Sequence, residues 1–229
     1  SWCVPIGTQN LHAAGAALAF KLRGEPRVAV CCVGDGGSSK TDTYAAINSA
    51  GAFTLPFIQC IINNQWAISV PRKAQTGAKT LAQKGLAGGL ESLQVDGNDI
   101  IAVKAAMEHA LKRARNGHGG SCIEFVTYRL SDHTTADDAR RYRGEQEVKE
   151  GWEREPFLRL RKYLTDLKVW DEEKEKLWLV DANKRADEEV NAYLATGVQP
   201  VEAMFDYLYG DMPADVAAQR EDAMKWEKH

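Results

Sequence analysis

Residues 33–40, VGDGGSSK, place one acidic side chain, Asp35, among glycines and serines directly after the apolar run 27–33. Glycine lets backbone N–H groups come close to an anion, and a helix that starts after the turn adds a partial positive charge. A carboxylate does not face a phosphate favourably unless a cation lies between them, and Mg²⁺ and Ca²⁺ both take oxygen ligands. The turn therefore predicts a phosphate site with a divalent metal ion held by Asp35.

A second polar pair, Asn63-Asn64, follows the next apolar run, residues 55–62. A Gly-Asp-Gly triplet alone is weak evidence for such a site, because it occurs by chance in about one chain in twenty of this size. If the two runs are parallel neighbouring strands joined by a helix over 40–52, both end at the same edge of the sheet. The Asn64 amide oxygen can then meet the Asp35 carboxylate around one cation, and the chance of the combination falls to about 1 % or less.

Helical and strand patterns alternate over the first part of the chain. Alanine-rich or amphipathic spacing predicts the helices, and short apolar runs predict the strands. The predicted helices are 8–23, 40–52 and 100–114, and the predicted strands are 27–33, 55–62, 93–95 and 122–127. Strands that are apolar throughout indicate a parallel sheet buried on both faces by helices. We therefore predict an α/β domain over residues 1–144, with an open, mostly parallel sheet flanked by helices.

From residue 145 the composition changes to long, charged stretches with helical spacing. We predict a C-terminal helical annex over residues 145–229, with helices at 151–168, at 171–195 and near 200–209. Four tryptophans are more than a short annex is expected to bury alone: Trp152, Trp170, Trp178 and Trp226. Because aromatic residues favour interface cores, a partner-binding surface is compatible with this prediction.

Composition argues against several classes of function. The 29 basic and 32 acidic residues of the 229-residue chain are mixed, with a formal net charge of −3, so no basic stripe predicts nucleic-acid binding. No apolar run approaches the roughly 20 residues that cross a bilayer. The five cysteines form no Cys-x-x-Cys pair, which argues against disulfides or zinc and fits a reducing compartment. We expect a protein of the bacterial cytoplasm or the mitochondrial matrix, with the cytoplasm preferred.

The polar loop over residues 128–143, YRLSDHTTADDARRYR, directly follows the predicted strand 122–127. Open α/β sheets place their ligands at the carboxyl edge of the strands, so this is a candidate active-site loop. On composition alone, a lone histidine such as His133 is more often a solvated residue. We expect two acids to order the loop through one of its arginines rather than to transfer protons: Asp137 and Asp138, with Arg140, Arg141 or Arg143.

Together these motifs resemble the thiamine-diphosphate signature, in which Gly-Asp-Gly is followed after about 25–30 residues by Asn-Asn. Three stretches narrow the resemblance: GTQ at 7–9, NNQWAISVP at 63–71 and HTTADD at 133–138. The chain resembles the alpha subunit of the first component of 2-oxo acid dehydrogenases, of the pyruvate or branched-chain type. The resemblance is strong from Pro5 to about Arg143 and looser beyond. It implies the thiamine-diphosphate-binding fold and a thiamine-diphosphate-dependent oxidoreductase.

The resemblance assigns a role to each residue that matches the family pattern. It implies that Mg²⁺ is held by the side chains of Asp35 and Asn64 and by the main-chain carbonyl of Trp66. Gly36 and Gly37 would offer their amides to the diphosphate of thiamine diphosphate.

Two further segments receive roles in the same way. Ile6, two residues before Thr8-Gln9, would lie with its backbone against the aminopyrimidine. His133, with Arg129 near it, would approach the diphosphate and the mouth of the channel. The resemblance implicates this histidine in handing the acyl group to the lipoyl carrier.

The resemblance also implies partners. Family members form α₂β₂ heterotetramers in which the beta subunit supplies the glutamate that activates the aminopyrimidine, and no glutamate of this chain stands in a matching motif. The substrate is a 2-oxo acid that loses CO₂, and the acyl group passes to a lipoyl acyltransferase core. We therefore expect this chain to bind the cofactor poorly and to catalyse nothing without a beta subunit.

Two departures from the family pattern bear on these expectations. Many members continue Gly-Asp-Gly with Glu or Gln and then Gly, whereas this chain has Lys40-Thr41, which alters loop contacts and leaves the metal ligands in place. Family members begin well upstream of Pro5, with a segment that supplies Arg and Tyr contacts to the diphosphate. Because this sequence starts at Ser1-Trp2, we expect a chain without that N-terminal part, which bears on its cofactor affinity.

The substrate stays open between two classes. HTTADDxxRYR and NNQWAISVP resemble bacterial pyruvate dehydrogenase alpha subunits, which favours pyruvate over a branched-chain 2-oxo acid. The stretch CxPxxTQ at 3–9 resembles the potassium-binding turn of branched-chain members, but Cys3 replaces an oxygen ligand, which disfavours a potassium site. A hypothesis from another class is a non-catalytic anion-binding α/β module. A Rossmann dinucleotide site is disfavoured, because no Gly-x-Gly-x-x-Gly follows a strand.

Overall fold

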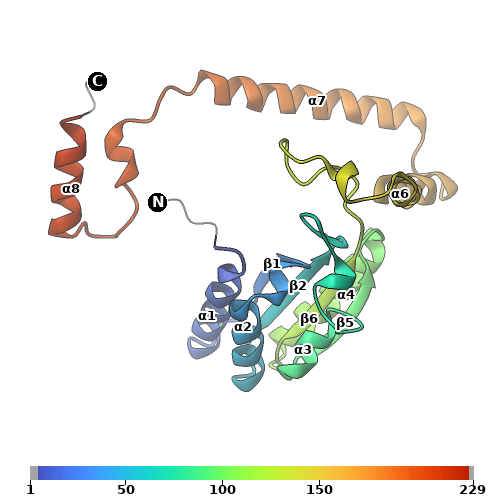
Figure 1. The fold of residues 1–229 in the computed structure, drawn as a ribbon, viewed down its shortest axis with the longest axis horizontal. Coiled ribbons are helices and arrows are strands. Elements are labelled where there is room, and N and C mark those ends of the chain that lie inside the picture. The colour runs from blue at the N-terminus through green and yellow to red at the C-terminus, as the bar shows by residue number, and fades with distance from the viewer. Residues whose placement is uncertain (1–4, 227–229) are drawn as a thin grey trace. The chain divides into compact units, whose positions relative to one another are not determined.

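The computed structural model describes residues 5–226, so the prediction that rests on Cys3 lies outside the described residues. The chain divides into two compact units, Ser1–Val169 and Trp170–His229. The sheet and its helices all belong to the first unit (Figure 1). The functional boundary expected at residues 144 and 145 stays a prediction.

The first unit is built on a parallel sheet of four strands in the order β1-β2-β6-β5 (Figure 1). The strands are β1 (Ala29–Gly34), β2 (Phe57–Asn63), β5 (Glu91–Asp96) and β6 (Ser121–Val126). Strands β1 and β2 are parallel neighbours, with Gly34 opposite Ile62, and the helix α2 (Thr41–Ala52) lies between them in the chain. The prediction of an α/β fold whose Asp35 and Asn64 leave adjacent strands at one edge is confirmed.

Helices cover both faces of this sheet. Alanines of α1 (Thr8–Leu22) and α2 pack on one face, around Phe57 and Ile61. The helix α4 (Ile100–Arg115) packs on the other face, over Ile58 and Ile123. Because α4 contacts β2, β5 and β6, this face of the edge strand β1 lacks a helical cover within the described residues.

The prediction that the strands are buried on both faces is therefore wrong for both edge strands: no residue of β5 is fully buried, and β1 is buried only at alternate residues. The β1 side chains alternate between buried and exposed, and Val30 keeps 45 % of its surface accessible. The neighbouring strand β2 is buried at every residue except Ile62. An apolar sequence thus identified both strands, but it did not show that one of them lies at the edge of the sheet.

The helical predictions beyond residue 145 were correct in kind and wrong in several boundaries. The predicted helix 151–168 is two helices, α5 (Glu145–Trp152) and α6 (Pro156–Asp166). Proline is favoured in the first helical turn, and the Glu155 side chain caps α6 by accepting the Leu158 N–H, so a new helix starts here. No helix in the described part of the chain is long and apolar enough to cross a membrane.

The second unit contains α7 (Glu172–Ala195), close to its predicted bounds. The stretch near 200–209 forms only a 3₁₀ turn, η4 (Val201–Met204), which packs against α8 (Ala214–Met224). Helix α8 was not predicted from the sequence. Several short elements of the first unit, which follow no strong periodicity, were not predicted either: β3 (Trp66–Ala67), β4 (Val70–Pro71) and α3 (Gln83–Ala87).

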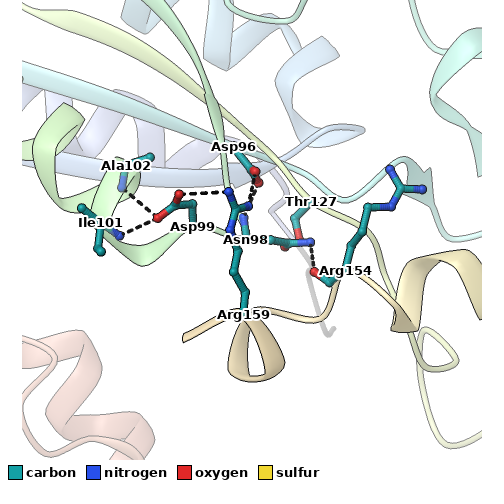
Figure 2. Close-up of polar contacts among 8 residues, drawn as sticks. All are labelled: Asp96, Asn98, Asp99, Ile101, Ala102, Thr127, Arg154 and Arg159. Carbon is teal, nitrogen blue, oxygen red and sulfur yellow. Dashed lines mark hydrogen bonds and ion pairs between the residues drawn. The ribbon is translucent and has the colours of Figure 1, made fainter. Parts of the chain in front are cut away.

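A polar clasp joins α6 to the carboxyl edge of the sheet (Figure 2). The Arg159 guanidinium of α6 contacts Asp96 at the end of β5 (2.5 Å) and Asp99 at the start of α4 (3.1 Å). The Asp99 carboxylate also caps α4 by accepting the backbone N–H groups of Ile101 and Ala102. The clasp fixes α6 next to the loops that follow the strands.

Asn98 makes two more hydrogen bonds between the segment before α6 and the carboxyl edge of the sheet. The Asn98 side chain donates to the Arg154 carbonyl (2.9 Å) and accepts from the Thr127 hydroxyl (2.5 Å), as Figure 2 shows. Burial raises the pKa of Asp96, but hydrogen bonds from Arg159 and from the Asn98 N–H outweigh it and hold that pKa below its ordinary value.

Replacing Arg159 with methionine should remove an acid-sensitive part of the stability. A lowered folded-state pKa means that Asp96 stabilises the fold above its ordinary pKa of 3.8 and that this contribution is lost as pH falls below that value. Because Arg159 is half exposed, we expect a small, salt-sensitive destabilisation at neutral pH that disappears in acid. Urea unfolding of both proteins over this pH range measures it. A destabilisation that stays constant into acid would show that the clasp acts through packing instead.

Candidate active site

The Gly-Asp-Gly-Gly turn leads from β1 into a short 3₁₀ helix, η1 (Gly37–Ser39), and is held from inside the protein. The Ser38 hydroxyl donates to the Asp35 carbonyl (2.6 Å). The Thr43 hydroxyl of α2 donates to the Gly37 carbonyl (2.9 Å), and the Asn10 amide of α1 donates in turn to the Thr43 hydroxyl (2.7 Å). These buried contacts fix the turn before any ligand is considered.

The Asp35 side chain is 2 % exposed and faces a residue that the sequence did not indicate. The Gln75 side-chain amide donates to the Asp35 carboxylate (2.5 Å) and to the Val70 carbonyl (3.1 Å). The Gln75 amide oxygen is buried without a hydrogen-bond partner in the described structure. Gln75 belongs to the polar loop after β4, where no motif or periodicity could have identified it.

The second predicted segment lies where β2 ends. The Asn64 side-chain oxygen accepts the backbone N–H of Trp66 (3.2 Å). The Trp66 indole is buried against the Tyr142 ring, with centroids 5.4 Å apart, and donates to the Glu147 carboxylate (3.1 Å). The Trp66 carbonyl oxygen accepts a long hydrogen bond from the Arg129 guanidinium (3.4 Å).

Close backbone packing at the two glycines brings three segments of the site together. A Cβ atom on Gly36 would lie 2.5 Å from the Cβ of Ala67, and one on Gly37 would lie 2.5 Å from a Val33 methyl and 3.3 Å from an Ile6 methyl. No side chain fits at either position without movement of its neighbours. The predicted residues Ile6, Gly36 and Gly37 therefore lie together with the segment that follows Asn64.

Gly36→Ala should destabilise the site through one identifiable clash, because its methyl group meets the Ala67 methyl. Overpacking of this kind typically costs about 1–3 kcal/mol of unfolding free energy. The double variant Gly36→Ala with Ala67→Gly removes the facing methyl, and we expect it to recover most of that loss. Chemical unfolding of the two single variants and the double variant measures the coupling. Additive losses would contradict the predicted contact.

The loop over residues 128–143 is tied to the site through Arg129. Its guanidinium donates to the Ile68 carbonyl (2.9 Å) and to the Tyr142 hydroxyl (2.7 Å). The Tyr142 hydroxyl donates to the Asp137 carboxylate (2.5 Å), which also accepts the backbone N–H of His133 (2.8 Å). Hydrogen bonds from Tyr142 and from the His133 N–H hold the pKa of Asp137 below its ordinary value. The chain of contacts positions the backbone of His133.

The expected roles of the loop acids were correct in part. Asp138 pairs with Arg140 (2.8 Å), as predicted. Asp137 orders the loop through Tyr142 rather than through an arginine, and Arg143 donates to main-chain carbonyls. The His133 side chain is exposed, and among the described residues its ring makes no hydrogen bond to Asp35 or Asn64.

A buried acid below the site is the largest feature that the sequence analysis missed. Glu124 lies in the middle of β6 and is 1 % exposed. Its carboxylate accepts hydrogen bonds from the Asn63 side chain (2.6 Å), the Ala82 backbone N–H (3.1 Å) and the Gln94 side chain (3.1 Å). Glu124 therefore fixes the residue that precedes Asn64.

Comparison with known proteins shows the family of this chain. Residues 3–210 match the dehydrogenase E1 component family. The chain belongs to this family. It is 42 % identical over 218 residues to the 3-methyl-2-oxobutanoate dehydrogenase subunit alpha of Mycobacterium tuberculosis, a match that covers 95 % of this chain and 59 % of the relative.

A second relative is named for a different 2-oxo acid. The chain is 43 % identical over 221 residues to the pyruvate dehydrogenase E1 component subunit alpha of Staphylococcus aureus, which covers 94 % of this chain. The chain spans 59 % of the length of each of these curated relatives. Its similarity is thus to E1 alpha subunits of both the pyruvate and the branched-chain type.

The residues at the strand edge of this E1 component fit a metal-bound diphosphate in their chemistry. Asp35, Asn64 and the Trp66 carbonyl offer oxygen atoms, the ligands that Mg²⁺ takes. Each of these oxygens accepts one hydrogen bond inside the protein, and such oxygens have further lone pairs. Gly36 and Gly37 pack so closely against Ala67 and Val33 that no side chain fits there, and residues without side chains leave their backbone amides free of a covering side chain of their own.

Proposed function

We propose that this chain is the alpha subunit of the decarboxylating E1 component of a 2-oxo acid dehydrogenase complex, and that it binds Mg²⁺ and thiamine diphosphate. One observation carries the proposal: the buried Asp35 and the Asn64 segment leave adjacent parallel strands at one edge, beside two glycines in close packing. Family membership supports it. The alternative of a non-catalytic anion-binding module gains no support from these relatives.

Specific residues of this chain would hold the cofactor. The Asp35 and Asn64 side chains and the Trp66 carbonyl would bind Mg²⁺, and the Gly36 and Gly37 amides would bind the diphosphate. Thiamine diphosphate, when bound, supplies a carbanion that adds to a 2-oxo group and accepts the electrons left behind by CO₂.

Two other parts of the chain would act around the cofactor. Ile6, whose side chain lies close to Gly37, would support the aminopyrimidine through its backbone. Arg129 would keep the loop in place through Tyr142 and Asp137, so that His133 is presented at the channel mouth to assist acyl transfer.

We propose pyruvate as the substrate, on the resemblance of the HTTADD loop and the NNQWAISVP stretch to bacterial pyruvate dehydrogenases. The relative from Mycobacterium tuberculosis supports the branched-chain alternative. Its identity to this chain, 42 %, hardly differs from the 43 % of the pyruvate relative, so identity alone does not choose between the two substrates. Both of these relatives are bacterial alpha subunits, which supports a beta-subunit partner in an α₂β₂ assembly, a lipoyl acyltransferase core and a cytoplasmic location.

The function is tested by assembling the protein with its beta partner and measuring CO₂ release from pyruvate and from 3-methyl-2-oxobutanoate, with thiamine diphosphate and Mg²⁺ present. We expect release from pyruvate to be faster, and no release from this chain alone. Faster release from the branched acid would move the protein to the branched-chain class. No release from either acid, in an assembly that forms, would contradict the proposed activity.

A further inference from the structure

A buried lysine lies behind the diphosphate turn and takes part in none of the contacts proposed for the ligand. Lys84, in the short helix α3, is 4 % exposed. Its ammonium group donates to three acceptors on η1: the Ser38 carbonyl (2.9 Å), the Ser38 hydroxyl (2.8 Å) and the Ser39 hydroxyl (3.1 Å). Because the Ser38 hydroxyl donates onward to the Asp35 carbonyl, Lys84 is linked to the whole turn.

The charge of Lys84 is poorly compensated inside the protein. Among the described residues no carboxylate lies within ion-pair distance, and all three acceptors on η1 are neutral. The Tyr44 ring of α2 lies 5.4 Å from the ammonium nitrogen and gives partial compensation. Burial, together with the Arg72 charge, lowers the pKa of Lys84 to about 8, although Asp35, Glu124 and the Cys122 thiol act in the opposite direction.

A buried cation without a counter-ion is costly, so proteins rarely keep one without a compensating interaction. Here the cation lies behind the turn whose glycines Gly36 and Gly37 are proposed to hold an anion. A diphosphate on the far side of the turn would add negative charge near Lys84 and would favour its protonated form.

We propose that Lys84 is a positioning residue for the diphosphate, since its ammonium group holds Ser38 and Ser39 and supplies, from behind the turn, positive charge that the bound anion compensates. This inference rests on the proposed function. It adds a cationic residue, distant in sequence from the Gly-Asp-Gly motif, to the binding site.

Calorimetric titration of thiamine diphosphate with Mg²⁺ into the α₂β₂ assembly tests this role. Lys84→Met should weaken binding about tenfold, the effect of losing one charge-assisted hydrogen bond. Lys84→Arg keeps the charge and should stay near the wild-type affinity. Lys79→Met is the matched control, because Lys79 is an exposed lysine five residues earlier in the same loop region and should leave affinity unchanged.

Proton uptake gives a readout that packing alone would not change. At pH values above 8, the wild type should take up more protons on binding than Lys84→Arg, since only a lysine with a pKa near 8 can be protonated by the ligand. Titrations in buffers of different ionisation enthalpy measure this difference, and they need only the wild type and the arginine variant to fold.

Three outcomes decide between the claims. The inference is supported if Lys84→Met binds more weakly while Lys84→Arg and Lys79→Met do not, and if the wild type takes up more protons than Lys84→Arg. Wild-type affinity in Lys84→Met, or equal losses in the methionine and arginine variants, would overturn it and leave the proposed function standing. No binding by the wild-type assembly at all would overturn both.

Discussion

Asp35→Ala is expected to lower the affinity of the α₂β₂ assembly for thiamine diphosphate and Mg²⁺ by more than about a hundredfold, because even outer residues of a metal site contribute 10–100-fold. Asp35 is the one carboxylate proposed as a metal ligand, and it is buried at the end of β1. Without its charge, the Mg²⁺ and diphosphate would meet only neutral oxygens. Calorimetry and the rate of CO₂ release measure the loss.

Two further variants separate lost ligation from lost structure. Asp35→Asn keeps an acceptor for the Gln75 amide and removes only the charge, so it should fold normally and still bind poorly. Asp42→Asn changes a partly exposed acid on the neighbouring helix α2, which accepts a hydrogen bond from the Thr8 hydroxyl, and should keep wild-type binding. Full affinity in Asp35→Asn would contradict the proposed metal site.

Glu124→Leu is expected to cause the largest loss of folding stability, about 3–5 kcal/mol, because each buried donor that is left without an acceptor costs about 1–3 kcal/mol. Leucine would leave the side chains of Asn63 and Gln94 and the Ala82 N–H without their acceptor in a fully buried position. Urea unfolding of the purified chain measures this difference.

Matched variants locate the origin of the loss. Glu124→Gln retains one oxygen acceptor and should lie between the wild type and the leucine variant. Glu108→Leu removes an exposed acid that pairs with the exposed Lys104 on α4, and we expect a change within about 0.5 kcal/mol. If Glu124→Leu were as mild as Glu108→Leu, Glu124 would not be the acceptor that holds the Asn63 segment.

The sequence allowed the position of the site to be predicted because local rules determine it. Two apolar runs separated by a helical pattern imply parallel neighbours, and parallel neighbours end at one edge. The turn at Asp35 and the pair at Asn64 were therefore found at adjacent positions, as expected. The assignment of Mg²⁺ and diphosphate to these residues came from the family resemblance and stays a proposal.

The side chains that hold the site in place could not be predicted from the sequence, because their roles depend on contacts between distant segments. Glu124 and Lys84 have the appearance of surface charges in the sequence, yet Glu124 meets Asn63 across 61 residues and Lys84 meets Ser38 across 46. Gln75 lies in a loop without periodicity and still contacts Asp35. Strand order, which leaves one face of β1 exposed at the edge, is likewise not encoded in the hydrophobic pattern of one strand.

The proposed function requires that the edge where β1 and β2 end binds a diphosphate through a metal ion. Its most direct test is the affinity of the wild-type α₂β₂ assembly for thiamine diphosphate, measured by calorimetry with Mg²⁺ and again with the metal removed by a chelator. We predict tight binding with Mg²⁺, a large loss on chelation, and no such metal dependence in Asp35→Asn. Equal affinity of the wild type with and without the metal would contradict the account.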